Sequence, residues 1–174
     1  MANLTYVNID DNIITAIEGY AFVGIPSLYY MKINNNKLTT ISAHTFETTD
    51  IRDGLDLSGN NISLIEEHAF GNITSLSLLN LTSNPINCDC GVYPFWSWVI
   101  ERISINAEAT CSNGTLITTL DSSELEKCNP DNCQCLNDGE CVMTGGGKVI
   151  CDCIEHWTGK LCQVVLWNGV LDNL

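Results

Sequence analysis

Four asparagines at a fixed spacing restrict the fold of this chain more than any other feature. They stand 24 residues apart, at Asn12, Asn36, Asn60 and Asn84. Aliphatic residues recur at the same offsets around them, and a phenylalanine recurs at one offset in three units, at Phe22, Phe46 and Phe70. A period of this length, held over three units and part of a fourth, indicates a stack of structural repeats.

The spacing within one unit predicts the role of each part. Aliphatic residues two positions apart place their side chains on one face of a short strand, and the residue between them points the other way. Each repeat therefore buries one strand face and exposes the other. A buried asparagine amide must be satisfied, so we expect the asparagines to bond to backbone groups of their own turn and of the adjacent coil. The phenylalanines should form a spine on the side opposite the strands.

The third unit departs from the pattern. Arg52 occupies a leucine position, and Thr49 stands where the neighbouring units carry Ile25 and Ile73. We expect this coil to be the loosest of the stack, with residues 47–54 displaced.

The second unit resembles the leucine-rich repeat, L-x-x-L-x-L-x-x-N-x-L. Its matching positions are Leu28, Met31, Ile33, Asn36 and Leu38. The resemblance implies an α/β-type solenoid with short parallel strands over residues 1–84, made of three coils and a partial fourth. The chain opens inside a repeat, without an N-terminal cap and without the basic start and apolar segment of a signal peptide. We therefore interpret it as a fragment.

All ten cysteines follow residue 87. The first four lie in residues 85–128, a segment that resembles the cysteine-rich C-terminal cap of extracellular leucine-rich repeat proteins. A solenoid needs such a cap because its last coil is otherwise open to water. Val92, Phe95 and Val99, with Trp98 beside them, have the spacing of an apolar helix face that could cover that coil. The resemblance implies two disulfides, Cys88 with Cys111 and Cys90 with Cys128.

The last six cysteines have a different spacing, C-x-C-x5-C-x9-C-x-C-x8-C. With the closing run Trp157-Thr158-Gly159-Lys160-Leu161-Cys162, residues 129–162 resemble an EGF-like module, which is small, all-β and disulfide-rich. The departures are the single residue between the first two cysteines and His156 where a glycine is usual. The resemblance implies three disulfides, Cys133 with Cys141, Cys135 with Cys151, and Cys153 with Cys162. Residues 163–174 are interpreted as a truncated tail.

Zinc is the competing use of clustered cysteines. The close pairs here are C-x-C rather than C-x2-C, and two of the three histidines, His44 and His68, lie in the cysteine-free half. We therefore predict no metal site. The run from Gly145 to Lys148 lacks the Ser or Thr of a phosphate loop, and is expected at the tip of the EGF hairpin instead. There is no H-E-x-x-H and no G-x-S-x-G sequence, so we predict no enzyme and no cofactor.

The net charge of −14 is spread along the whole chain. Phosphate backbones and sulfated glycans need clustered Lys or Arg, so the composition argues against nucleic acid and heparin as partners. The apolar stretch Val164–Trp167 is far shorter than the roughly 20 residues of a membrane span, so we predict no membrane contact within this fragment. The Asn-x-Ser/Thr sequons fit a secreted glycoprotein or the ectodomain of a membrane protein. They are at Asn3, Asn61, Asn72, Asn80 and Asn113.

The exposed, concave face of the strands is the predicted ligand-binding surface. Two columns of side chains should cross it, one with Tyr6, Tyr30, Gly54 and Leu78, the other with Asn8, Lys32, Asp56 and Asn80. Tyr6 and Tyr30 should be neighbours, because parallel strands lie about 4.8 Å apart. Exposed aromatic side chains are common interface anchors, although ordinary strand-face tyrosines explain the pattern equally well. Lys32 is expected to pair with Asp56. The predicted ligand contacts are Tyr6, Asn8, Tyr30, Lys32, Asp56 and Leu78.

The order of repeats, cap and EGF-like module resembles the repeat-to-EGF junction of Slit guidance proteins and of vasorin-type receptors. It implies an extracellular protein-binding module that serves ligand recognition, cell adhesion or guidance-type signalling through the concave face, with a protein ligand or receptor as partner. Two alternatives stay open: the ectodomain of an innate-immune pattern-recognition receptor, and a structural matrix or spacer fragment. The EGF-like module argues against the first, because Toll-like ectodomains lack it.

Overall fold

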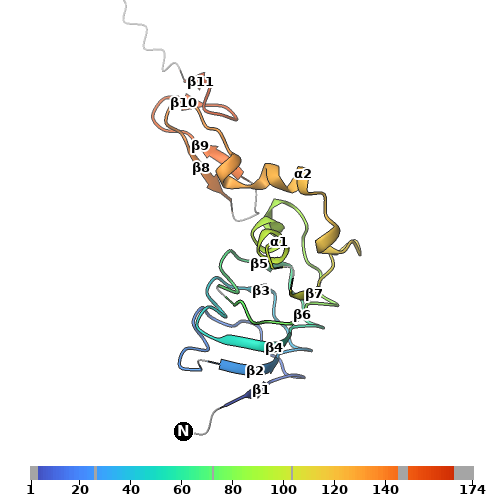
Figure 1. Cartoon of the computed structure of the whole chain (residues 1–174). Coiled ribbons are helices and arrows are strands. Elements are labelled where there is room, and N and C mark those ends of the chain that lie inside the picture. Colours follow the sequence, from blue (N-terminus) through green and yellow to red (C-terminus); the bar gives the residue numbers. More distant parts are fainter. Residues whose placement is uncertain (1–3, 26, 72, 103, 145–148, 167–174) are drawn as a thin grey trace, which may run out of the picture.

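The computed structural model describes residues 4–25, 27–71, 73–102, 104–144 and 149–166. The chain is elongated (Figure 1), with the repeats at one end, a small helical segment in the middle and a pair of short antiparallel sheets at the other end. No helix in the described ranges is long and apolar enough to cross a membrane.

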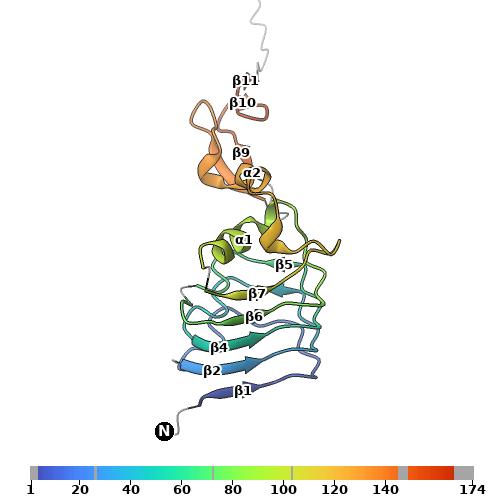
Figure 2. The ribbon, with the colours of Figure 1, turned by 45° about the vertical axis from the view of Figure 1, so that its right-hand side comes forward.

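The repeats and the cap together form one five-stranded parallel sheet. Its strand order is β1-β2-β4-β6-β7, and neighbouring strands follow one another along the stack (Figure 2). The bounds are β1 Tyr6–Asn8, β2 Ser27–Lys32, β4 Asp50–Asp56, β6 Leu78–Asn80 and β7 Asn106–Glu108. Two shorter strands, β3 (Thr40–Ile41) and β5 (Leu64–Ile65), pair in parallel in a separate sheet. The predicted α/β-type solenoid with short parallel strands is confirmed.

The strand β7 comes from residues 85–128, the segment predicted to be the cap. It pairs with β6 in the same parallel register as the strands before it. Every second residue here faces the core: Ala107 in the strand is half-buried, and Ile105 and Ala109 on either side of the strand are buried. The cap therefore adds a strand to the sheet as well as covering the last coil.

The buried asparagines tie each coil to the one before it. Asn60 Nδ2 donates to the Ile33 carbonyl of the previous coil at 3.1 Å and to two carbonyls of its own turn, and Asn60 Oδ1 accepts from the Leu38 amide at 3.1 Å. Asn36 and Asn84 repeat this set of bonds in their own coils. Both the turn and the adjacent coil supply partners, as the sequence predicts.

The third coil is displaced but not loose. The register between β2 and β4 shifts between the Leu28–Ile51 pair and the Tyr30–Gly54 pair. β4 has one extra residue there, which forms a bulge. The bulge puts Ile51, fully buried, into the core position that Arg52 would otherwise occupy, and leaves Arg52 exposed. Thr49 is also buried, and its hydroxyl donates to the Phe22 carbonyl at 3.2 Å. The predicted displacement is present, whereas the predicted looseness is wrong, because Ile51 fills the first position and the buried, hydrogen-bonded Thr49 fills the second.

The cap contains one regular helix, α1 (Tyr93–Ile100), with Pro94 in its first turn, where a missing amide proton costs nothing. Val92, Phe95 and Val99 are buried, as the spacing predicts, and so are Tyr93 and Trp96. The remaining helical turns are short: η1 Cys90–Val92, η2 Ile117–Thr119, α2 Ser122–Leu125, η3 Glu126–Cys128 and η4 Pro130–Asn132.

An aromatic spine runs through the repeats into the cap. The rings of Phe22 and Phe46 are stacked with centroids 5.5 Å apart, and those of Phe46 and Phe70 are 5.7 Å apart. Phe70 then meets Phe95 and Trp98 of α1 at 5.7 and 5.0 Å. The Trp98 indole also donates to a repeat carbonyl, that of Gly71, at 3.1 Å. The spine therefore continues beyond the last repeat and anchors α1.

The EGF-like end consists of two small antiparallel sheets. Strand β8 (Glu140–Met143) pairs with β9 (Val149–Asp152), and β10 (Trp157–Thr158) pairs with β11 (Val164–Val165). The predicted hairpin tip, residues 145–148, lies outside the described residues. Five disulfides join the pairs that the family resemblances imply: 88–111, 90–128, 133–141, 135–151 and 153–162.

Candidate binding face of the parallel sheet

The exposed side of the parallel sheet carries two columns of side chains, which we call the strand face. The strand pairing aligns Tyr6, Tyr30, Gly54, Leu78 and Asn106 in one column. The second column contains Asn8, Lys32, Asp56, Asn80 and Glu108. All six residues predicted to contact a ligand thus lie together on one surface. Asn106 and Glu108 were not foreseen, because they belong to the strand that the cap supplies.

Tyr6 and Tyr30 form a stacked pair at the N-terminal end of the strand face. Their ring centroids are 5.9 Å apart and their planes differ by 18°. The Tyr30 ring lies over Gly54, where an added Cβ would collide with it. Tyr29 is 60% exposed beside them, and Tyr6 is 45% exposed. The lack of a side chain at Gly54 therefore fixes where the Tyr30 ring can rest.

The surroundings of Tyr30 are electrostatically negative. Partial burial raises the pKa of the Tyr30 hydroxyl above its ordinary value, and the charges of Asp56 and Asp53 raise it further, while Lys32 opposes them. Two carboxylates and one ammonium group thus act on this hydroxyl.

We expect Gly54→Ala to displace the Tyr30 ring while leaving the fold intact. The new methyl group would occupy the space of the ring, and the ring is the movable partner because it is the far end of a side chain. The near-ultraviolet circular dichroism of the stacked tyrosines should fall, while the midpoint of thermal unfolding should drop by less than about 5 °C. A cooperative loss of the far-ultraviolet signal at room temperature would contradict this expectation.

The second column is held by short turn bonds rather than by ion pairs. Asp56 Oδ1 accepts from the Ser58 amide at 3.0 Å and from its hydroxyl at 2.6 Å. Asn80 Oδ1 makes the same two contacts with Thr82, and Asn8 Oδ1 accepts from the Asp10 amide. The predicted pairing of Lys32 with Asp56 is wrong: among the described ion pairs none involves Lys32, and the nearby hydroxyl and amide bind the Asp56 carboxylate instead.

The sequons differ in where they lie. Asn80 is half-buried on the strand face, and the glycan that we predict there would cover the end nearest the cap. Asn61 and Asn113 are exposed and lie away from the two columns. Asn3 and Asn72 fall outside the described residues. Modification of these asparagines stays a prediction.

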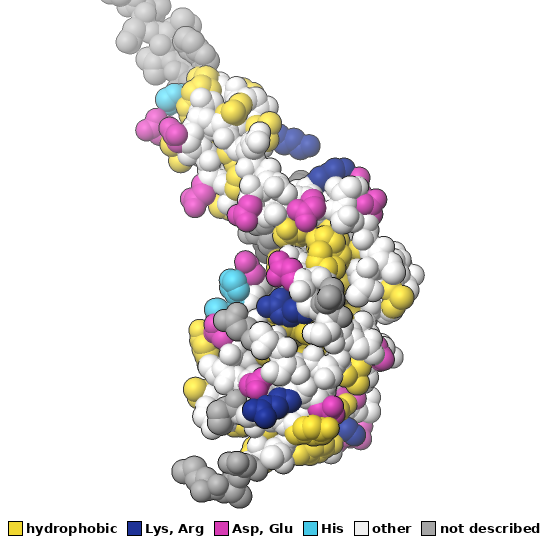
Figure 3. Space-filling model, viewed as in Figure 1, with side chains coloured by type: hydrophobic (Ala, Val, Ile, Leu, Met, Phe, Trp, Pro, Cys, Tyr) yellow, Lys and Arg dark blue, Asp and Glu magenta, His cyan; other side chains and the backbone are white. Residues whose placement is uncertain are grey.

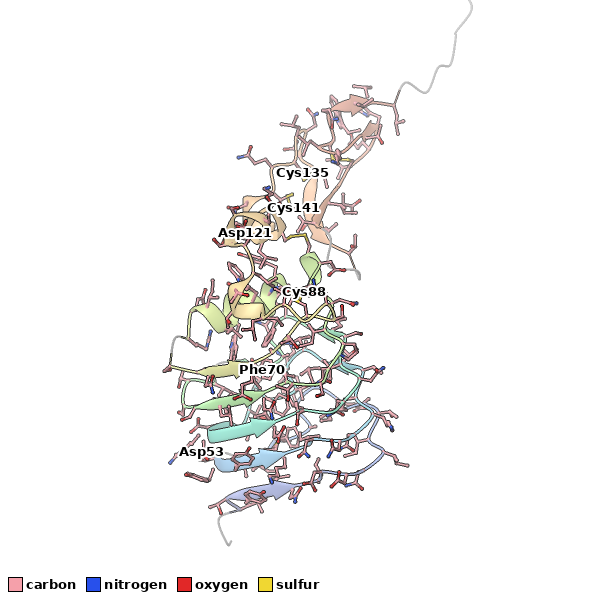
Figure 4. All side chains as sticks on the ribbon, turned by 90° about the vertical axis from the view of Figure 1, so that its right-hand side faces the viewer. Asp53, Phe70, Cys88, Asp121, Cys135 and Cys141 are labelled. Carbon is pink, nitrogen blue, oxygen red and sulfur yellow. A yellow bond between two sulfur atoms is a disulfide. The ribbon has the colours of Figure 1, made fainter. Side chains whose placement is uncertain are left out.

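Four cysteine sulfurs lie within 4.8 Å of one another: those of Cys133, Cys135, Cys141 and Cys151. Such a group could bind zinc only as free thiolates. All four are in disulfides, and the single residue between Cys133 and Cys135 brings the two bridges together, with Cys135 and Cys141 sulfurs 3.2 Å apart (Figure 4). The close approach therefore reflects disulfide packing, which follows from the short C-x-C spacing.

We expect the chain to show no micromolar affinity for calcium. Calcium takes about six to eight oxygen ligands. Calcium-binding EGF-like modules carry an acidic run before the first cysteine, and residues 129–132 match it only in part. Those modules also carry an Asp or Asn and an aromatic residue between the third and fourth cysteines, whereas residues 142–150 contain none of these. Titration calorimetry of the whole chain, with a calcium-binding EGF-like module as the positive control, checks this. Saturable heat at micromolar calcium would refute it.

A second concavity lies between the last coil and the cap. It has a volume of about 620 Å³ and is lined by Phe70, Trp98, Arg102, Glu101 and Asp131, among other side chains. The Arg102 guanidinium stacks over Trp98 at 4.6 Å and donates to the Trp98 carbonyl at 3.0 Å. These contacts hold Arg102 in the cap.

Comparisons with known proteins agree with this architecture. Residues 2–49 match the leucine rich repeat family, and residues 128–161 match the EGF-like domain family. The chain is also similar to the protein named abnormal pharyngeal pumping eat-20 of Caenorhabditis elegans, with 28% identity over 108 residues. That alignment covers 55% of this chain and 13% of the relative, so the chain spans a small part of the relative's length. The order of leucine-rich repeats followed by an EGF-like module is therefore confirmed.

Proposed function

We propose that this chain, a leucine-rich repeat solenoid joined through a disulfide-bonded cap to an EGF-like module, recognises an extracellular protein through the strand face. Both matched families are protein-interaction modules. The observation that carries the proposal is the stacked pair of Tyr6 and Tyr30, with Tyr29 beside it, on a sheet face that no described element covers.

The tyrosines have the properties of interface anchors. A tyrosine offers a large apolar ring with a polar end, and such residues are enriched among the contacts that dominate binding energy. The Tyr30 ring is held between Tyr6 and the backbone at Gly54. A side chain that is already ordered loses less conformational entropy when a partner binds.

The cysteine chemistry supports an extracellular location. All ten cysteines are in disulfides and none is free. Disulfides of this density persist in oxidising compartments and are rare where thiols are kept reduced. Together with the sequons, this favours a secreted protein or an ectodomain.

The test compares the half-buried Tyr30 of the strand face with Tyr20, an exposed tyrosine on the opposite side of the solenoid. The whole chain is screened against purified secreted and ectodomain proteins, and the binding partner is then titrated with Tyr30→Ala and Tyr20→Ala variants. Tyr20 is 49% exposed and stacks on His44, away from the sheet. We expect Tyr30→Ala to weaken binding by at least about tenfold, the usual scale for an interface anchor, and Tyr20→Ala to change it less than twofold, roughly. Unchanged affinity with Tyr30→Ala would exclude the strand face.

A spacer role is the second candidate, because the junction between the cap and the EGF-like module is braced. Asn132 Nδ2 donates to the Glu126 carbonyl and to its carboxylate, both at 3.1 Å. The α2, η3 and η4 turns follow one another across this junction. A spacer would bind no protein in the screen. The distribution of distances between spin labels on the repeats and on the EGF-like module would nevertheless be narrow, and Asn132→Ala would broaden that distribution.

A further inference from the structure

The strand face carries more acidic than basic side chains. Asp56 and Glu108 stand in its second column, where Lys32 is the basic residue, and Asp53 directly precedes Gly54 of the first column. Asp53 is labelled at the edge of the sheet in Figure 4. The neighbouring Arg52 does not offset them, because its guanidinium bonds to Asp50 at 3.2 Å.

These carboxylates keep oxygen atoms free for a partner. In Asp56 the turn bonds from Ser58 reach Oδ1 alone. Asp53 makes no side-chain hydrogen bond or ion pair among those described, and only its backbone carbonyl accepts, from Ser77. Both carboxylates lie close enough to Tyr30 to act on its hydroxyl. The Tyr6 ring, which is 45% exposed beside them, adds to the attraction, since the face of an aromatic ring attracts cations.

We infer that the strand face binds a cationic segment of its protein partner, with an arginine or lysine side chain lying along the Tyr6–Tyr30 stack and its charged end toward Asp53 and Asp56. This inference rests on the proposed function and names the chemistry of the partner. A cation gains both the exposed part of the Tyr6 ring and the carboxylates, whereas an acidic or phosphorylated segment meets like charge. The net charge of −14, part of which is visible as acidic side chains scattered over the face in Figure 3, would also speed the approach of a basic partner.

The opposite side of the solenoid has aromatic and acidic side chains in a different arrangement. Tyr20 stacks on His44, and His44 stacks on His68, so two of the three rings become cations when protonated. Two carboxylates there lie beside histidines, since Glu47 is 2.9 Å from His44 Nδ1 and Glu67 is 3.5 Å from His68 Nε2. This side therefore offers a cation less than the strand face does, and provides a control surface.

The experiment uses the whole chain and a fluorescent arginine-bearing peptide, with the same peptide in which citrulline replaces every arginine as the neutral control. The test variant is the double substitution Asp53→Asn and Asp56→Asn. At the register positions equivalent to Asp56, asparagine already stands as Asn8 and Asn80 and accepts the same turn bond, and the Asp53 side chain makes no described bond that asparagine would lose. The matched control, Glu66→Gln with Glu67→Gln, removes the same charge from the opposite side.

We expect the arginine peptide to bind and the citrulline peptide to bind at least about tenfold more weakly. The strand-face double variant should weaken arginine-peptide binding by about tenfold, and the control double variant by less than about twofold. Tyr30→Ala should weaken binding more than Tyr30→Phe, because phenylalanine keeps the stacked ring that holds Tyr6 in place. Equal losses in the two double variants, or equal binding of the two peptides, would overturn the inference, because net charge or uncharged contacts would then explain the binding.

The outcomes separate this inference from the proposed function. If Tyr30→Ala abolishes binding of the screened protein and the Asp53→Asn, Asp56→Asn variant binds it normally, the strand face is the recognition surface and its partner is not cationic there. If Tyr30→Ala leaves that binding unchanged, the proposed function itself fails.

Discussion

Replacing Phe46 by alanine is expected to lower the free energy of unfolding by about 4 kcal/mol, the scale for removing a large buried ring. Phe46 is fully buried, and its ring lies between those of Phe22 and Phe70. Its loss leaves a cavity in the middle of the aromatic spine, and the coils on both sides cannot close it because the asparagine bonds fix their spacing. Since small domains are stable by only about 5–15 kcal/mol, this single change removes much of the stability of the repeats.

Urea unfolding followed by circular dichroism measures this loss, with Phe22→Ala as the matched control. Phe22 has the same offset in its coil but stacks on one ring, and 9% of it is exposed. Its substitution should cost about half as much, because a partly open site loses less packing. Equal losses at the two positions would show that the spine does not act as a continuous column.

The repeat could be predicted in detail because its interactions recur. Each strand pairs with a copy of itself 24 residues further on, as Tyr6 does with Tyr30, so one unit determines the register of the next. The same argument places the asparagine bonds and the phenylalanine stack. The two columns of the strand face follow from the alternation of buried and exposed positions, which is a local property of a strand.

Features that depart from the regular repeat pattern were harder to predict. The strand β7 has only Ala107 as an inward residue, with Ile105 and Ala109 buried on either side of it, and small residues give a weak periodic signal. The bulge in β4 depends on Ile51 replacing Arg52 in the core, which requires the backbone to gain a residue. Charge spacing alone suggested a Lys32–Asp56 pair, but a local bond from Ser58 forms with less loss of side-chain freedom.

The acidic character that we infer for the strand face could not be predicted from the sequence pattern either. The alternation identifies Tyr6 and Tyr30 as exposed neighbours, yet the position of the Tyr30 ring depends on contact with Gly54 in another coil. The contribution of Glu108 depends on the pairing of β7 with β6. The acidic character that we infer for this face therefore arises from residues that only the folded stack brings together.

Asn60→Ala is expected to cost about 3 kcal/mol of unfolding free energy, because a buried amide group would be left without its acceptor. The Leu38 amide donates to Asn60 Oδ1 in the interior, and no other acceptor for it is described. The carbonyls of Ile33 and Leu57 are less affected, since each also accepts from another asparagine of the 24-residue series, Asn36 for Ile33 and Asn84 for Leu57.

The matched control is Asn12→Ala, which removes the same residue from the same position of the first coil. Asn12 is exposed and bonds only to carbonyls of its own turn, those of Ile9 and Asp10. Water can replace those bonds, so the cost should stay below about 1 kcal/mol. Asn60→Asp should be at least as harmful as Asn60→Ala, because a carboxylate keeps the acceptor but faces the carbonyls without donors. Urea unfolding of the three variants measures the differences. Similar small losses at Asn60 and Asn12 would mean that the Leu38 amide finds another acceptor. The hydrogen bonds of the repeated asparagines could then not be what joins the coils.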